Sequence, residues 1–319
     1  LDIQAIEKVR KILSLLKQQG KTIIIAEHRT YYLKDLVDRA LYMENGKIIR
    51  EYTMAELADL TFEEQLQSGI RTVDLLSYPI TPHVAFPANH VIELKDIHCS
   101  YERTEALSIP SLSMPSGKIT AIIGTNGAGK STFVSYMCGL MKKNKGTFLL
   151  DGKKQTAKER VQKSYLVMQE VNHQLFSDSV REEIVLGNRD SSENSLQKIM
   201  ETLDISVLTE RHPMTLSGGQ KQRVIIASAM FCGKKILYFD EPTSGLDFSH
   251  MMQTCQLLNQ LHGEDVFVFI ITHDYELIAS VCDSVIHIEH GKLFEQYDLD
   301  ANGIQKLKSF FTQCARNTI

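Results

Sequence analysis

The sequence predicts an α/β fold built around a phosphate-binding loop. Three segments support this fold class: a glycine-rich loop from Gly124 to Thr132, a buried strand from Ile236 to Glu241 that delivers two carboxylates, and a strand from Val266 to Ile271 that precedes a histidine. The loop reads GTNGAGKST and fits the pattern G-x-x-x-x-G-K-[ST]. A domain from about Val91 to Tyr297 would contain all three segments, and its length suits one αβ domain.

The surroundings of the loop are those that a phosphate-binding loop requires. The apolar run from Ile119 to Ile123 precedes it, and the helix-compatible segment from Ser131 to Leu140 follows it. Its glycines let backbone N–H groups turn inward around phosphates, Lys130 supplies a cation, and the Ser131 hydroxyl can ligate Mg²⁺. The expected phosphate-binding residues are Gly124, Thr125, Asn126, Gly127, Ala128, Gly129, Lys130, Ser131 and Thr132.

A second phosphate-binding device is expected 86 residues after Lys130. It consists of Leu216, Ser217, Gly218, Gly219 and Gln220, at the start of an apolar-periodic helix from Lys221 to Met230. Two glycines and a serine at a helix start leave unpaired backbone N–H groups and the positive end of the helix dipole.

The loop and the LSGGQ segment together resemble the ATP-binding cassette (ABC) ATPases, whose other motifs follow in order. The resemblance implies a RecA-like αβ core with antiparallel-β and helical subdomains. It implies that Asp240 acts on Mg²⁺ through water and that Glu241 is the general base for the attacking water. Ser244 to Asp247 resembles the family's D-loop, and His273 its switch histidine, which hydrogen-bonds the γ-phosphate.

Two further positions match the family. Gln169, in YLVMQEVNHQLF, falls where the family places the Q-loop glutamine, which contacts Mg²⁺ and the attacking water. Tyr101, 23 residues before Gly124, matches the aromatic residue that stacks on adenine. The resemblance therefore implies ATP and Mg²⁺ as cofactors. Because cassettes of this family pair head-to-tail, LSGGQ must come from a second cassette, either a lost N-terminal one or another copy of this chain.

An internal repeat supports the presence of a second cassette. A shift of 245 positions aligns Leu1-Asp2 with Leu246-Asp247, His28 with His273, Asp38 with Asp283, Glu44 with Glu289, and Gly46-Lys47 with Gly291-Lys292. It also aligns the expected strands Thr22 to Ala26 and Ala40 to Met43 with Phe267 to Ile271 and Val285 to Ile288. Residues 1–60 are therefore expected to be the C-terminal remnant of a first cassette, truncated at its N-terminus.

The rest of the chain divides around the cassette at 91–297. Residues 61–90 hold three of the seven prolines and are expected to be a linker. A helical subdomain is expected around Ser179 to Thr215. Residues 298–319 are expected to form a helical tail, whose amphipathic part from Ile304 to Phe311 could contact either the cassette or a partner.

Composition restricts the function further. A net charge of −4 and a pI near 6.3 argue against broad nucleic-acid binding. The longest apolar runs are the size of strands, so no segment is expected to span a membrane. Six cysteines without C-x-x-C spacing indicate reduced, mostly buried thiols.

Three classes of protein use paired cassettes. The tandem form, Glu27 to Arg29 and the segment VMQEVNHQLFSDSVREEIVLG resemble the ATPases of prokaryotic energy-coupling factor importers, which take up vitamins and transition-metal ions. That resemblance implies a place on the cytoplasmic face of the membrane, a transmembrane coupling protein bound around Val171 to Phe176, and a separate substrate-binding membrane subunit. The alternative is a soluble ABC-F translation factor, although the linker is not long and charged. A DNA-repair or chromosome-organising ATPase is excluded. In those proteins a coiled coil hundreds of residues long separates the phosphate loop from LSGGQ, whereas only 46 residues lie between Gln169 and Leu216 here.

Overall fold

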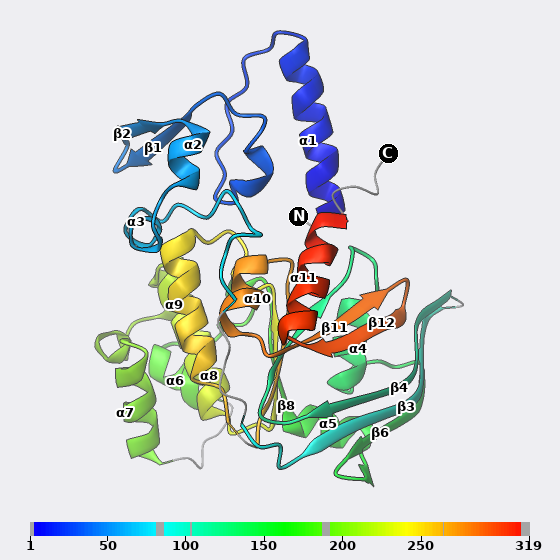
Figure 1. Cartoon of the computed structure of the whole chain (residues 1–319). Helices are drawn as coiled ribbons and strands as arrows, with labels where there is room; N and C mark the ends of the chain where they lie inside the picture. The colour runs from blue at the N-terminus through cyan, green and yellow to red at the C-terminus, as the bar shows by residue number, and fades with distance from the viewer. Residues whose placement is uncertain (1–2, 81–85, 103, 187–191, 264, 314–319) are drawn as a thin grey trace.

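The computed structural model of the chain describes residues 3–80, 86–102, 104–186, 192–263 and 265–313. Within these ranges the strands form a ten-stranded sheet, in the order β7-β6-β3-β4-β12-β11-β5-β10-β9-β8, and a two-stranded sheet of β1 and β2 (Figure 1). The predicted α/β fold is confirmed.

Parallel strands form the half of the large sheet that positions the functional residues. This half contains β8 (Ser164–Val167), β9 (Ile236–Asp240), β10 (Phe267–Ile271), β5 (Ile119–Ile123) and β11 (Ser284–Glu289). β10 lies between β5 and β9 and pairs parallel with both. Every residue of β5 and β10 is buried, as expected for parallel strands covered on both faces. The carboxyl ends of β5, β9 and β10 therefore meet at one edge of the sheet.

Antiparallel strands form the other half of the sheet. It contains β3 (Val91–Tyr101), β4 (Thr104–Pro115), β6 (Asn144–Leu150), β7 (Lys153–Lys154) and β12 (Lys292–Asp298). β3 pairs antiparallel with both β4 and β6. Successive residues of β5 contribute to different apolar clusters, Ala121 to one and Ile122 to the other, so the core lies on both faces of the sheet.

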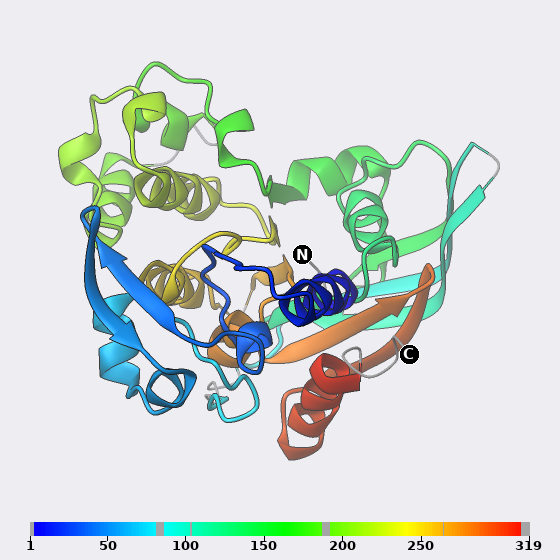
Figure 2. The ribbon, with the colours of Figure 1, turned by 90° about the horizontal axis from the view of Figure 1, so that it is seen from above.

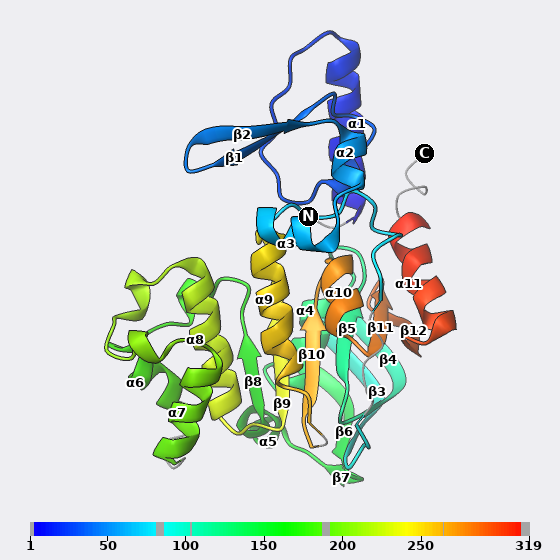
Figure 3. The same ribbon diagram turned by 60° about the vertical axis from the view of Figure 1, so that its left-hand side comes forward.

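Helices cover the sheet and build a subdomain beside it. α4 (Lys130–Met137) follows the phosphate-binding loop, and α5 (Ala157–Lys163) precedes β8. Figure 3 shows α6 (Val180–Val185), α7 (Glu193–Thr202) and α8 (Gly218–Phe231) grouped beyond β8 and β9, where a helical subdomain is expected. The remaining cassette helices are α9 (Phe248–Asn259) and α10 (Tyr275–Val281), with short 3₁₀ turns η2 (Val171–His173), η3 (Ser206–Leu208) and η4 (Pro213–Thr215).

The N-terminal region repeats part of the local structure at the end of the cassette. It contains α1 (Ile3–Gln18), the 3₁₀ turn η1 (Tyr31–Leu33), β1 (Ala40–Glu44) and β2 (Lys47–Tyr52). The hairpin pairs Glu44–Lys47 and Glu289–Lys292 lie at the same 245-residue offset that the sequence shows. Both hairpins also have a register shift at the same repeat position, after Tyr42 and after His287.

One predicted element of the N-terminal region is wrong. The segment from Thr22 to Ala26, expected as a strand, has no regular secondary structure, and Ile24 is 94% exposed. Its counterpart β10 has a parallel strand on each side, whereas no described strand pairs with this segment. A lone apolar strand cannot satisfy its backbone, which explains the difference.

The N-terminal region lies over the edge of the sheet at which the parallel strands end. The arrow of β10 points toward it in Figure 3, and Figure 2 shows α1 above the middle of the molecule. Two helices follow the hairpin, α2 (Met54–Ala58) and α3 (Phe62–Ser68), each with a capping box at its start.

The segment predicted as a linker is packed on the cassette where the structure describes it. After α3, a left-handed Gly69 turns the chain, and Arg71 and Tyr78 are buried against the cassette, whereas Val73 is buried against Tyr52 and Leu57 of the N-terminal region. The prolines that suggested a linker do not prevent this docking, because the cation of Arg71 and apolar side chains of the segment contact the cassette. Residues 81–85, which include Pro82, lie outside the described residues.

The C-terminal tail packs on the cassette, which decides the question left open by the sequence. In α11 (Ala301–Gln313), Leu307, Phe310 and Phe311 are buried, and the ring of Phe311 meets Tyr275 edge-on at 5.2 Å. Residues after Gln313 lie outside the described part of the chain.

The cysteines within the described residues are free and buried, as the sequence indicates. Burial raises the pKa of the Cys138 thiol to about 12, so this thiol stays protonated and unreactive near neutral pH. The sixth cysteine, Cys314, lies outside these residues. Among the described helices, none has the length and apolar character needed to cross a membrane.

Candidate functional site

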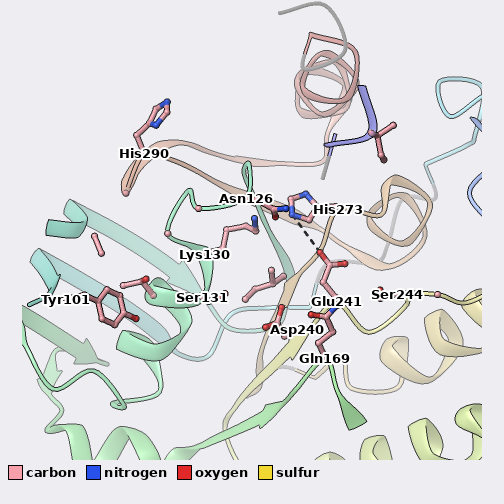
Figure 4. Close-up of a pocket in the computed structure, with 18 of the residues that line it drawn as sticks. Tyr101, Asn126, Lys130, Ser131, Gln169, Asp240, Glu241, Ser244, His273 and His290 are labelled. Atoms are coloured by element: carbon pink, nitrogen blue, oxygen red, sulfur yellow. Dashed lines mark ion pairs between the residues drawn. The ribbon is translucent and has the colours of Figure 1, made fainter. Parts of the chain in front are cut away.

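A cavity of about 790 Å³ lies at the carboxyl ends of the parallel strands (Figure 4). Its volume is within the roughly 300–1,000 Å³ typical of sites for small molecules and cofactors. The predicted residues that line it come from six separate segments: Tyr101; Asn126, Gly127, Gly129, Lys130, Ser131 and Thr132; Gln169; Asp240 and Glu241; Ser244 and Gly245; and His273. The structure thus brings together residues that lie far apart in the sequence.

The phosphate-binding loop is shaped by glycines in backbone conformations that other residues rarely adopt. Gly124 has φ 145°, and a Cβ added there would collide with the carbonyl oxygen of Ile288. Gly129 has φ 105° at the start of α4. The first N–H groups of α4 are therefore presented at the cavity, where a helix N-terminus favours an anion.

Lys130 lies in the centre of the loop. Its Nζ atom donates to the backbone oxygens of Gly124 at 2.8 Å and Thr125 at 3.0 Å. Thr125 is fixed in turn by a hydrogen bond of 3.0 Å from its hydroxyl to Oε2 of Glu289. Gly124, Thr125 and Ala128 do not line the cavity, so their part is to shape the loop.

The two carboxylates at the end of β9 are held in different ways. Asp240 ends the strand, and burial raises the pKa of its carboxyl, opposed by the Lys130 cation. Glu241 has a positive φ of 49°, and its N–H donates to the backbone oxygen of Ile271 at 2.9 Å. Burial raises the pKa of Glu241 to about 7, opposed by the Arg29 guanidinium. A carboxylate with this pKa suits general-base chemistry near neutral pH.

His273 lies beside Glu241. Its Nε2 atom is 3.8 Å from Oε1 of Glu241, and its side chain is nearly buried (Figure 4). Gln169 reaches the same cavity from the loop after β8, and Tyr101 from the end of β3, where it is 54% exposed. An exposed aromatic ring at the mouth of a polar cavity can stack on a planar ligand.

The LSGGQ segment lies outside this cavity. Ser217 caps α8: its hydroxyl accepts from the N–H of Gln220 at 3.3 Å, and Gln220 Oε1 accepts from the N–H of Ser217 at 3.0 Å. Leu216 is buried, whereas Ser217 and Gly218 are exposed. None of the five residues lines the cavity, which agrees with the expectation that a cassette cannot cover its own phosphate loop.

Some residues of the cavity were not predicted to lie there. Ile6, Glu27, Arg29 and Tyr32 of the N-terminal region line the cavity, although the resemblance assigned them no role there. Their position could not be read from the repeat, because it depends on how the N-terminal region docks on the cassette.

The oxygen donors at the cavity can supply part of the shell of a magnesium ion bound to a nucleotide. The described residues contain no group of three or more His, Cys, Asp or Glu side chains that could hold a metal. Mg²⁺ typically uses one or two protein oxygens and completes its shell with phosphates and waters. Ser131, Gln169 and Asp240 all line the cavity and can supply such a partial set.

The fold and the cavity define a phosphate-loop nucleotide-binding protein. Residues 107–244 match the family model described as "ABC transporter". An ABC transporter ATP-binding protein of Treponema denticola is 40% identical over 320 residues, which cover 98% of this chain and 65% of the relative. Another, from Clostridium tetani, is 30% identical over 319 residues, covering 91% of this chain and 73% of the relative. The chain belongs to the ATP-binding proteins of ABC transporters.

Solved structures of ABC proteins have a similar fold. CbiO1 of Clostridium perfringens, described as part of the ABC transporter complex CbiONQ, is 26% identical with a TM-score of 0.59, and the match covers 70% of this chain and 97% of that one. A bacterial Atm1-family ABC exporter with ATP bound has a TM-score of 0.60 at 23% identity, covering 78% of this chain and 45% of that one. The chain spans less than two thirds of the Treponema denticola relative.

Proposed function

We propose that the chain is the ATP-binding and ATP-hydrolysing subunit of a prokaryotic membrane importer of the energy-coupling factor type, for a vitamin or a transition-metal ion. The observation that carries the proposal is the convergence of Lys130, Asp240, Glu241 and His273 on one cavity. A cation, two buried carboxylates and a histidine beside a helix N-terminus are the groups that phosphoryl transfer to water requires.

Each side chain has a defined part in the proposed reaction. The N–H groups of the loop and Lys130 would hold the β- and γ-phosphates, and Tyr101 would stack on adenine. Ser131, Gln169 and Asp240 would hold Mg²⁺, which neutralises charge on the phosphates. Glu241 would orient the attacking water and take its proton, while His273 would hydrogen-bond the γ-phosphate.

A second cassette would complete the site, because the LSGGQ segment does not line the cavity of its own chain. We infer that residues 1–60 correspond to the end of a first cassette, that 91–297 is the complete cassette, and that 61–90 connects them. The matching hairpins, with register shifts at the same repeat position, support this division. The LSGGQ segment that covers this cavity would come from a first cassette or from a second copy of this chain.

A membrane subunit would bind next to Gln169. Met168 is 47% exposed and Phe176 is 77% exposed, on either side of the turn η2. Exposed apolar side chains this close to the cavity suit docking of a helix from a transmembrane coupling protein. Substrate selection would then reside in a separate membrane subunit, and the chain would lie on the cytoplasmic face of the membrane.

A soluble translation factor of the ABC-F type is the alternative. Its long charged linker has no counterpart here, because the described part of residues 61–90 is short and holds buried Arg71 and Tyr78. Fractionation of cells that produce the tagged chain separates the two functions. Recovery with an integral membrane protein supports the importer, and recovery with ribosomes overturns it.

Hydrolysis of MgATP measured over a range of protein concentrations tests the proposed activity. Since LSGGQ must come from another cassette, the turnover per chain should be low in dilute protein and rise with concentration as chains associate. Glu241→Gln should keep nucleotide binding while turnover falls by about 10²- to 10⁴-fold, the usual contribution of a general base.

Two results would count against the proposal. Normal turnover by Glu241→Gln would remove this residue from the role of base. A turnover per chain that stays high and constant down to concentrations at which the protein is monomeric would show that no second cassette is needed.

A further inference from the structure

The chain that follows α3 is bound between two loops of the cassette. The N–H of Phe248 donates to the backbone oxygen of Gly69 at 2.8 Å, and Nε of Arg71 donates to the backbone oxygen of Leu246 at 3.0 Å. Both contacts hold the loop after β9, which carries Ser244 to Asp247. The contacts join residues that lie about 175 positions apart in the sequence.

The same arginine also holds the loop after β10. Nη1 of Arg71 lies 2.7 Å from Oδ2 of Asp274 and 2.9 Å from Oε2 of Glu276. The N–H of Thr72 donates to the other oxygen of Glu276 at 3.1 Å. The side chains of Arg71, Asp274 and Glu276 are each at most 3% exposed. Buried charges in such contacts are firmly placed, because separating them would leave an unpaired charge without water.

Asp274 connects this cluster to the cavity. It directly follows His273, and its Oδ2 atom accepts from the hydroxyl of Thr243 at 2.8 Å, close to the carboxylates at the end of β9. Nη2 of Arg29, which lines the cavity, lies 3.8 Å from the same oxygen. Arg71 itself does not line the cavity, so any effect on the reaction must pass through these loops.

The carboxylates that contact Arg71 have no counterparts in the first repeat. At the 245-residue offset, the N-terminal positions that correspond to Asp274 and Glu276 are Arg29 and Tyr31. The pair of carboxylates that receives Arg71 is therefore absent from the first repeat. The segment after the first repeat can act on the site of the second, but the equivalent contact cannot form in reverse.

We propose that Arg71 is a positioning residue that fixes the loop of Ser244 to Asp247 relative to the loop of His273, so that hydrolysis in the cassette depends on the segment that follows the first repeat. The inference rests on the proposed ATP hydrolysis at this cavity. A movement of the first repeat that displaces Arg71 would shift both loops without touching the phosphate-binding loop.

Arg71→Lys tests this role in the full chain. Lysine keeps the positive charge beside Asp274 and Glu276 but lacks the planar fork that also reaches Leu246. We expect kcat to fall by about 10- to 100-fold, the usual cost of a small misplacement near the reacting groups. The affinity for MgATP should remain that of the unchanged protein, because Lys130 and its loop are not contacted by Arg71.

Arg39→Lys is the matched control, since Arg39 forms an exposed ion pair of 3.3 Å with Glu51 on the N-terminal hairpin. It should change neither kcat nor affinity. An unchanged kcat in Arg71→Lys, or an affinity that falls in step with kcat, would overturn the positioning role.

A second measurement is independent of turnover. Amide hydrogen exchange should become faster in residues 244–247 and at His273 in Arg71→Lys, with residues 124–132 unaffected. If the unchanged protein hydrolyses no ATP, the proposed function fails. The exchange measurement would still show whether Arg71 positions the two loops. Unchanged exchange in both loops would refute the positioning role.

Discussion

The two hairpins of the chain share one local structure but have opposite surroundings. In the N-terminal hairpin, β1 and β2 expose most of their residues, and Leu41 is 46% exposed. In the cassette, all residues of β11 except the last are buried. Ile286, which occupies the same repeat position as Leu41, is fully buried. The hairpin and its register shift are thus determined locally, whereas burial depends on the neighbouring strands.

The two histidines at equivalent repeat positions differ in the same way. His28 is exposed, and the segment before it forms no strand. His273 is nearly buried beside Glu241, because β10 lies between two parallel strands that place its end at the cavity. The same sequence motif therefore contributes to a site only where the sheet places the other functional groups beside it.

Shortening the equivalent side chains Ile286 and Leu41 should give the largest difference between the two hairpins in the free energy of unfolding. Ile286→Ala should lower the free energy of unfolding by about 2–5 kcal/mol, because it opens a cavity in the core. Leu41→Ala should change it by about 0.5 kcal/mol or less, as for most surface substitutions. Urea unfolding followed by circular dichroism measures both. Equal losses would show that the N-terminal hairpin is buried as deeply as the cassette hairpin.

The equivalent glycines provide a smaller contrast. Gly46 and Gly291 have φ of 76° and 73°, so alanine at either position costs about 1–2 kcal/mol of backbone strain. A Cβ at Gly46 would meet no atom within 4 Å, whereas one at Gly291 would lie 2.6 Å from the backbone oxygen of Ala106. Gly291→Ala should therefore lose about 1–3 kcal/mol more in the same urea experiment. A difference of zero between the two variants would contradict the close approach at Gly291.

The sequence predicted the cassette well because its signals are local. A strand, a glycine-rich loop and a helix in order predict where Lys130 lies, and the structure places Lys130, Asp240 and His273 at one cavity. The repeat likewise predicted the strand from Ala40 to Met43, which lies within β1. Patterns of this kind need no knowledge of distant parts of the chain.

The parts that were missed depend on contacts between distant segments. Thr22 to Ala26 has the apolar pattern of a strand, but a strand requires neighbours that the described chain does not supply. Arg71 lies in a segment that composition indicated to be a linker, and only its docking on Asp274 and Glu276 makes it part of the site. A single charge in the sequence carries no information about a partner about 200 positions away.

Calorimetric titration with MgATP tests most directly the claim that the nucleotide site lies in the second repeat. The unchanged chain should bind MgATP, and Lys130→Ala should lose measurable binding, because the cation at the centre of the phosphate loop is removed. Lys153→Ala, which removes an exposed lysine from β7, should bind as the unchanged chain does. Binding to Lys130→Ala with unchanged affinity would contradict the account.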